Sequence, residues 1–152
     1  MSVSVQRGDF DPGRELKALL EGRRDIGGVV SFVGLVRDFS EGTGVGALTL
    51  EHYPGMTEKA LEKIEREAHD RFDIDATRIV HRHGRMEPGE RIVLVIAASS
   101  HRGEAFRACE FLIDWLKTKA PFWKSEETPE GARWVEARGS DDNATRRWDD
   151  EG

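Results

Sequence analysis

The segment from Arg91 to Ala98 constrains the fold of this chain more than any other part of it. Its sequence, RIVLVIAA, is apolar after the first residue. Such a run is typical of a strand at the centre of a sheet. The pair Pro88-Gly89 lies just before it and indicates a turn. We therefore expect residues 77–86 and 90–98 to form an antiparallel hairpin.

Two long helices are predicted, one on each side of this hairpin in the sequence. Residues 57–72 repeat apolar side chains along one helical face, and the helix predicted over 101–119 ends before Pro121. Strands and helices alternate without a regular βαβ rhythm, so we expect an α+β fold. The remaining expected elements are a helix over 12–22 and strands over 3–5, 27–36, 47–52, 122–124 and 133–137.

The chain of 152 residues has the usual size of a single domain. We expect residues 1–138 to form that domain and residues 139–152 to form a polar, partly mobile tail. The glycine-rich stretch 38–46 is expected to be a mobile loop, and it lacks the Gly-Lys-Ser/Thr of a phosphate loop.

The composition excludes several classes of protein. No apolar run approaches the roughly 20 residues that cross a membrane, and the start of the chain does not look like a signal peptide. One cysteine excludes an internal disulfide and a cysteine-based zinc site, so we expect a cytoplasmic protein. The net charge of −6 argues against broad nucleic-acid binding.

The segment from Trp115 to Lys124 is the strongest candidate for a functional site. It places Lys117, Lys119 and Lys124 among apolar and aromatic residues. A lysine in such a setting either acquires a lowered pKa that suits catalysis or attracts an anion. The alternative is that the lysine stems cover apolar neighbours while the ammonium groups reach water.

Other basic residues lie where predicted elements begin or end. The stretch 99–104 (SSHRGE) joins a strand to a helix, where Ser99 or Ser100 could cap the helix and free N–H groups favour an anion. Arg102 adds a guanidinium suited to phosphate. Arg37 and Arg138 each follow an apolar strand, where a charged residue can also mark only the point at which the strand reaches water.

Histidine and cysteine give weaker signals. His81 and His83 share one face of a predicted strand, but two imidazoles without further ligands make a poor zinc site. Cys109 falls within the apolar pattern of the second long helix, so we interpret it as a core residue. No metal and no cofactor are expected.

Six motifs in order resemble one known family. They are FVGLVR at 32–37, LEHYPGM at 50–56, HRHG at 81–84, SHRG at 100–103, LKTKAPFWK at 116–124 and GARWVEAR at 131–138. The chain is similar over nearly its whole length to the large, catalytic subunit of molybdopterin synthase. The motif at 116–124 is the most specific of the six.

This resemblance implies a fold, partners and a reaction. The fold is of the α/β hammerhead type, and the subunit forms a homodimer within a heterotetramer. Each copy binds a small ubiquitin-like sulfur carrier whose C-terminal Gly-Gly ends in a thiocarboxylate. The enzyme then moves two sulfurs onto cyclic pyranopterin monophosphate to form the dithiolene of molybdopterin, and no metal takes part in this step.

The resemblance also implies roles for particular residues. Lys117 and Lys124 match the catalytic pocket lysines, Arg138 matches an arginine that reaches in from the partner subunit, and at Lys119 an arginine would serve the same charge role. The carrier tail is expected beside Phe32, Pro121 and Phe122. The expected substrate-binding set comprises Arg37, His101, Arg102, Lys117, Lys124, Ser125, Glu126 and Arg138.

The chemistry of the residues agrees with that expectation. A phosphate and a thiocarboxylate repel each other in a pocket of low dielectric, and the basic residues could neutralise both. Lys117 suits acid–base work or transient covalent capture of the carrier's terminal carbonyl, and the sequence leaves both open. The rival hypothesis is a non-catalytic adaptor that binds anions or RNA through an open basic and aromatic surface.

Overall fold

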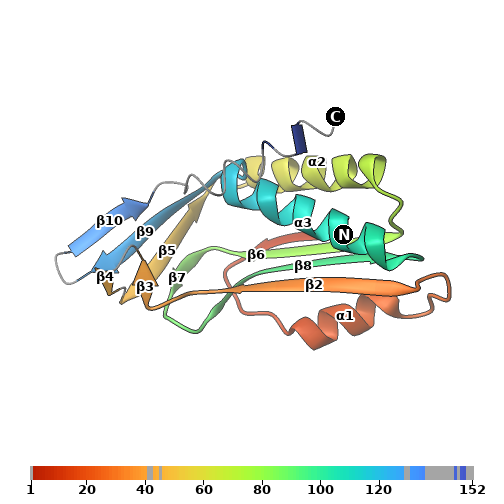
Figure 1. Cartoon of the computed structure of the whole chain (residues 1–152). Coiled ribbons are helices and arrows are strands. Elements are labelled where there is room, and N and C mark those ends of the chain that lie inside the picture. Colours follow the sequence, from red (N-terminus) through yellow and green to blue (C-terminus); the bar gives the residue numbers. More distant parts are fainter. Residues whose placement is uncertain are drawn as a thin grey trace.

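The computed structural model describes residues 2–40, 43–44, 46–128, 131–135, 146 and 148–149. In this part of the chain three helices accompany two four-stranded sheets and a two-stranded ribbon, which confirms the α+β prediction (Figure 1). The elements in chain order are β1 (Val3–Gln6), α1 (Pro12–Leu20), β2 (Gly28–Leu35), β3 (Phe39–Ser40), β4 (Thr43–Gly44), β5 (Ala47–His52), α2 (Met56–Arg71), β6 (Ala76–Arg82), β7 (Gly84–Met86), β8 (Arg91–Ser99), α3 (Arg102–Thr118), β9 (Phe122–Thr128) and β10 (Gly131–Val135).

The apolar strand β8 lies inside the first sheet, as the sequence predicts. The strand order is β1-β6-β8-β2, and β8 runs antiparallel to both of its neighbours. Its side chains alternate between two buried layers. Val93, Val95 and Ala97 pack with α2 and α3, whereas Leu94 and Ile96 pack with Phe10 and the apolar side of α1. Helices therefore cover both faces of this sheet (Figure 1).

The predicted strand 77–86 is interrupted, and this break joins the two sheets. β6 pairs with β8 as far as His81, whereas β7 turns away and pairs with β5 in the second sheet. Gly84 lies at the break with φ +96°, a backbone angle that residues with a Cβ atom rarely adopt. The second sheet has the order β10-β9-β5-β7 and is antiparallel throughout.

Two other segments differ from expectation. The stretch 38–46 is not entirely loop, because β3 and β4 pair as a short antiparallel ribbon. Trp148, in the segment expected to form a polar tail, is buried and packs edge-on against Phe72 and Phe111. Its indole N–H donates to Asp114, 2.5 Å away. Residues 136–145 lie outside the described residues, so the proposed boundary at 138 stays a prediction.

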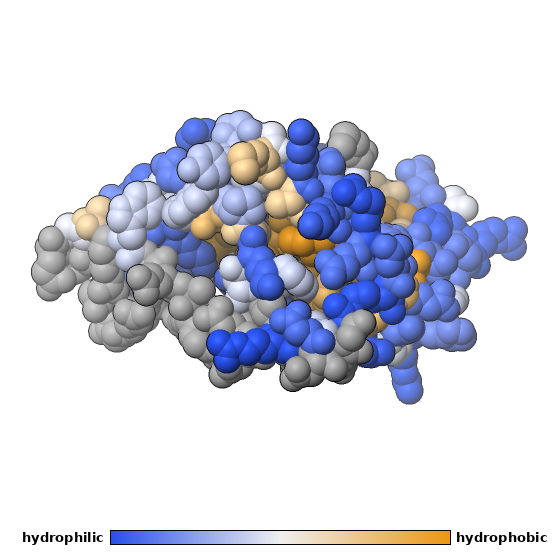
Figure 2. All heavy atoms as spheres, turned by 90° about the horizontal axis from the view of Figure 1, so that it is seen from above, coloured by the Kyte–Doolittle hydropathy of each residue, from blue (hydrophilic) through white to orange (hydrophobic). Residues whose placement is uncertain are grey.

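The surface agrees with a chain that is rich in charge. From the side covered by α2 and α3, it is mostly hydrophilic, with hydrophobic atoms visible near the middle (Figure 2). None of the described helices is long and apolar enough to cross a membrane. The cytoplasmic location stays a prediction.

Candidate active site

The predicted lysine site lies where α3 ends and β9 begins. Lys117 is exposed in the last turn of α3, and Lys124 is half-buried on β9. The chain between them turns sharply, because the N–H groups of Lys119 and Ala120 both donate to the carbonyl of Trp115. This turn brings the two lysines toward the same end of the first sheet.

Lys119 faces a different environment from the other two lysines. Its ammonium nitrogen lies 4.2 Å from the centroid of the Trp115 ring, a cation–π contact. The Lys119 side chain is exposed. This position matches the alternative interpretation, in which a lysine covers an apolar neighbour and reaches water.

His81 joins the two sheets at the lysine site. It lies near the end of β6 and is 7% exposed. Its ring stacks on that of Phe122 from β9, with the centroids 3.8 Å apart and the planes 18° from parallel. Burial, followed by the positive charges of Lys124 and Lys117, lowers the pKa of His81 to about 4. Lys124 comes two residues after Phe122 on the same face of β9, next to the residue that covers the His81 ring.

An imidazole pair, His52 and His83, lies beside His81. His52 of β5 lies opposite Phe122 of β9 in the sheet register. Its ring stacks on His83 with the centroids 4.1 Å apart. Burial, followed by the charge of His52, lowers the pKa of His83. The described residues contain no group of three or more His, Cys, Asp or Glu side chains that could hold a metal.

The residues predicted to line the carrier tail also gather here. Phe32 from β2 and Phe122 from β9 both pack against the core cluster that contains α2 and α3. The carbonyl of Pro121 accepts a hydrogen bond of 3.2 Å from the hydroxyl of Thr57. Pro121 and Phe122 therefore adjoin the lysine site along the chain, whereas Phe32 lies opposite Val95 in the middle of β2 and shares only the apolar core with them.

Arg37 lies at the same end of the first sheet. It is exposed and follows Val36, which is buried. The N–H of Val36 donates to Glu90, so the strand end is held beside the start of β8. Since β8 starts where α3 ends, Arg37 and Lys117 lie on the same side of the molecule.

The predicted substrate residues on β9 point in two directions. Side chains alternate along a strand, so Lys124 and Glu126 share the face of Phe122 while Ser125 lies on the other face. Glu126 is 6% exposed. Ser125 lies opposite Thr49 on one side and Trp134 on the other. One protomer therefore does not place Ser125 and Lys124 on a common face of the sheet.

His101 and Arg102 lie at the far end of α3. Both are exposed at its N-terminus, and the 15 residues from Arg102 to Lys117 span about 22 Å of helix. The predicted serine cap is wrong, because His101 is the N-cap and makes no side-chain capping bond. The buried hydroxyl of Ser99 donates to the carbonyl of Asp73 and accepts the N–H of His101 at 3.1 Å, so it contacts the helix start without being its cap residue.

The structure thus brings some of the predicted site residues together and places others far from them. Arg37, Lys117, Lys124, Pro121 and Phe122 lie toward one end of the first sheet, Phe32 lies in its middle, and His101 with Arg102 lies at the other end. Arg138 lies outside the described residues. A shallow hollow on α1 is lined by Asp11, Arg14, Glu15 and Ala18, none of which is a predicted site residue.

His81 is the residue that sequence reasoning placed in the wrong context. The alternation along the strand paired it with His83, and only the break at Gly84 separates their surroundings. The glycine after HRH was the available signal, since glycine inside a strand pattern often marks a bend.

Comparisons with known proteins show the family of this chain. Residues 5–119 match the family model described as MoaE protein. The chain is 57% identical over 150 residues to the molybdopterin synthase catalytic subunit of Pseudomonas aeruginosa, covering 99% of this chain and 100% of that protein.

Solved structures share the fold. The molybdopterin biosynthesis MoaE protein from Burkholderia ambifaria has a TM-score of 0.83 and 52% identity, with 97% of each chain covered. A Helicobacter pylori structure, described as a complex of subunits 1 and 2 of molybdopterin-converting factor, has a TM-score of 0.74 at 23% identity. It covers 91% of this chain and 92% of that one, and this likeness concerns the fold.

Proposed function

Because the chain belongs to the MoaE protein family, we infer that it is the catalytic subunit of a molybdopterin synthase. It acts with a small sulfur-carrier subunit whose C-terminal Gly-Gly ends in a thiocarboxylate. It transfers sulfur from that group to cyclic pyranopterin monophosphate and forms the dithiolene of molybdopterin. One arrangement of this chain carries the proposal: Lys117 ends α3, Lys124 lies on the strand that follows, and Phe122, two residues before Lys124 on that strand, stacks on the buried imidazole of His81.

The lysine site suits a reaction between two anions. The substrate phosphate and the thiocarboxylate repel each other, and this repulsion grows as water is excluded. Lys117 and Lys124 supply two positive charges at the place where both must meet, and Arg37 supplies a third at the same end of the sheet. Their role is to lower the free energy of bringing the anions together.

Lys117 is the proposed reactive amine. It lies exposed in the last turn of a helix, so its amine is accessible while the backbone is held by the helix. Lys124 is held on a strand between β5 and β10, where its charge is fixed in position. We assign Lys117 to proton transfer or covalent capture of the carrier's carbonyl, and Lys124 to retention of the anionic substrate.

The carrier tail is proposed to enter between the two sheets. Phe32 and Phe122 offer an apolar lining, and two glycines without side chains suit a narrow passage. On the outer face of the second sheet, Trp123 is 41% exposed and meets Tyr53 edge-on at 4.6 Å, and Trp134 is 65% exposed. Exposed aromatic side chains of this kind favour a protein partner, which we identify as the body of the carrier.

A second copy of the chain completes the site. His101 and Arg102 lie about 22 Å along α3 from Lys117, so they cannot reach the same phosphate within one protomer. In a homodimer, the N-terminal end of α3 from one copy can approach the lysine site of the other. Arg138, also expected from the partner, and Ser125 with Glu126 complete the proposed substrate-binding set.

The direct test is sulfur transfer in a purified system. Incubation of the chain with thiocarboxylated carrier and cyclic pyranopterin monophosphate is expected to form molybdopterin, detected as its fluorescent oxidation product. A carrier without its two terminal glycines is expected to give none. Undiminished product from the truncated carrier would reject the proposed tail route, and no product from the intact carrier would reject the function.

A further inference from the structure

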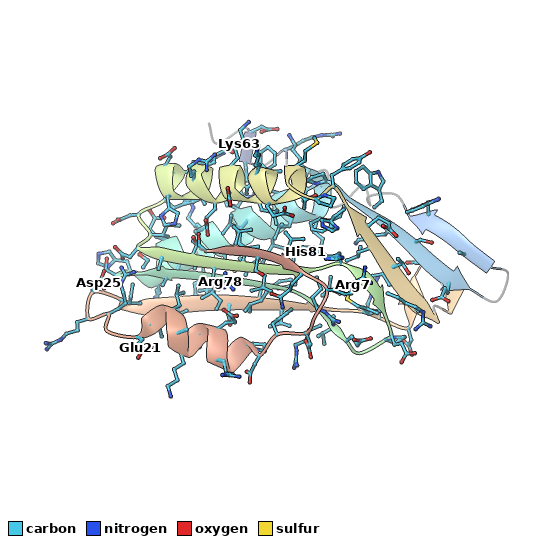
Figure 3. The ribbon with its side chains drawn as sticks, turned by 180° about the vertical axis from the view of Figure 1, so that it is seen from behind. Arg7, Glu21, Asp25, Lys63, Arg78 and His81 are labelled. Atoms are coloured by element: carbon cyan, nitrogen blue, oxygen red, sulfur yellow. The ribbon has the colours of Figure 1, made fainter. Side chains whose placement is uncertain are left out.

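His81 is a buried imidazole whose position none of the roles above explains. It lies on β6 where the first sheet approaches the second (Figure 3). Phe122 covers one face of its ring at 3.8 Å, and the side chain is 7% exposed. The ring is therefore fixed in orientation at the edge of the lysine site.

One ring nitrogen is satisfied and fixes the tautomer. Nδ1 of His81 lies 2.9 Å from the carbonyl oxygen of Arg82. A carbonyl oxygen can only accept, so Nδ1 carries the hydrogen. Nε2 of the neutral ring then holds a lone pair.

The other nitrogen has no partner in the described part of the chain. Within the described residues, the His81 ring makes one hydrogen bond, through Nδ1 to the carbonyl of Arg82. Among the described residues, one side-chain nitrogen or oxygen is both fully buried and without a partner, and it is Nε1 of Trp115. Nε2 of His81 is therefore not fully buried and reaches accessible space. A lone pair that reaches accessible space can accept a proton or a hydrogen bond from a water molecule at this site.

Three elements present charged or titratable groups to this ring. They are Lys117 from α3, Lys124 from β9 and His52 from β5. Burial and these neighbours keep the ring neutral in the free protein, with a pKa of about 4. Anions bound to the two lysines would offset their repulsion and raise that pKa toward the range in which a general base works well.

We propose that His81 is a further catalytic residue of this site, whose Nε2 accepts a proton from the water that releases the sulfur carrier. This inference rests on the proposed function. When a thiocarboxylate gives up its sulfur, the acyl group left behind becomes a carboxylate only by gaining an oxygen, which water supplies.

The step balances as follows for an acyl–sulfur bond between carrier and substrate. The water oxygen bonds to the carrier's carbonyl carbon, and the carbon–sulfur bond breaks. The electron pair of that bond stays on the sulfur, which remains on the substrate. Of the two protons that water loses, one goes to Nε2 of His81 and the other to solvent.

The variant His81→Asn tests this role. Its amide N–H₂ can replace Nδ1 as the donor to Arg82, but nothing replaces the Nε2 lone pair. In a single turnover with thiocarboxylated carrier and cyclic pyranopterin monophosphate, we expect a covalent carrier–substrate adduct to accumulate, measured by intact mass. Release of the carboxylate form of the carrier should slow by about 10²–10⁴-fold, as for loss of a general base.

His83→Asn is the matched control, because it removes an imidazole two residues away whose charged neighbours are His52, Arg7, Glu51 and Glu58 rather than the two lysines. It is expected to release the carrier at close to the wild-type rate. Wild-type release by His81→Asn would overturn the proposal. So would equal slowing of adduct formation and release, or equal slowing in the two variants.

Nitrogen NMR of the wild-type protein gives an answer that does not depend on a folded variant. The Nε2 resonance of His81 should be that of a neutral ring in the free protein at pH 7. It should move toward the protonated value when substrate and a carboxylate-terminated carrier are bound together. An unmoved resonance would overturn the base role, whereas failure of the wild-type protein to form any adduct or product would overturn the proposed function itself.

Discussion

The lysines at 117, 119 and 124 are close in sequence and differ in their surroundings. Lys117 ends α3 and Lys124 lies on β9 beside Phe122, which stacks on the buried ring of His81, whereas Lys119 lies over the indole of Trp115. The residue types predicted that a basic site exists in this segment. They could not distinguish the three, because the distinction depends on where α3 ends and on how β9 leaves that end.

Lys117→Ala is expected to reduce sulfur transfer by about 10²–10⁴-fold, which is typical for loss of an acid–base group. Its effect on folding should be small, because alanine is a good helix former at an exposed position. Lys117→Arg should be nearly as inactive, because arginine keeps the charge but does not readily deprotonate. Single-turnover rates and thermal unfolding measure the two effects.

Lys119→Ala serves as the control and should stay within a few-fold of the wild-type rate. Lys124→Ala should chiefly weaken substrate retention, seen as a raised KM. If Lys117→Arg keeps near-full transfer, then Lys117 is an electrostatic anchor and its assignment as the reactive amine is wrong.

His81 also predicts a pH dependence of stability. Its pKa is about 4 in the folded protein and close to 6.5 in the unfolded chain, so the unfolded state binds the proton more tightly. The His81 contribution is therefore fully present above pH 6.5 and is lost as the pH falls toward 4. The free energy of unfolding then falls by about 3 kcal/mol, because each unit between the folded and unfolded pKa of His81 contributes about 1.36 kcal/mol.

Urea unfolding of the wild type and of His81→Asn between pH 4 and pH 7.5 measures this effect. The free energy of unfolding should fall more steeply toward acid in the wild type, because titrating carboxylates affect both proteins alike. Parallel curves would show that the ring is not held neutral by the fold.

At the scale of elements, periodicity and turn residues predicted most of the fold. The strand 47–52 matches β5 at both ends, and the helices predicted over 57–72 and 101–119 match α2 and α3 within one residue at each end. These segments carry their own local signals, namely alternation, helical apolar spacing and a proline after the last helix. The break between β6 and β7 was not predicted, because pairing with a second sheet is a long-range property.

Gly84→Ala is expected to destabilise the protein by about 1–2 kcal/mol, because φ +96° is unfavourable for a residue with a Cβ. The new Cβ would also lie 3.1 Å from Nη1 of Arg7, which must shift. Gly103→Ala is the matched control. A Cβ there meets nothing within 4 Å, and alanine is favoured over glycine in a helix by about 1 kcal/mol.

Chemical unfolding of both variants measures the two changes in stability, which should have opposite signs. If Gly84→Ala is as stable as the wild type, the left-handed turn is not what directs β7 into the second sheet.

At the scale of the whole molecule, one protomer supplies only part of the proposed site. The exposed basic groups lie at opposite ends of α3, about 22 Å apart. The helix predicted over 101–119 already implies this separation, because its length sets the distance between its ends. How a second copy would approach is a long-range property that no local signal gives. The proposed homodimer makes a prediction about mixtures of inactive variants.

Lys117→Ala and Arg102→Ala should each be inactive as homodimers but should recover activity when combined. In a mixed dimer, one site takes Lys117 from one copy and Arg102 from the other and is intact, while the second site lacks both. With random assortment, about half of the dimers are mixed and each has one intact site, so about a quarter of all sites are intact. Co-expression should therefore restore about a quarter of the wild-type rate. Lys117→Ala combined with Lys124→Ala is the control and should give no more activity than the two variants give separately, because both lysines come from the same copy in every site. Light scattering must show a dimer in each preparation. A monomer, or a dimer in which the first pair recovers no more activity than the second, would mean that α3 does not join two sites across the dimer.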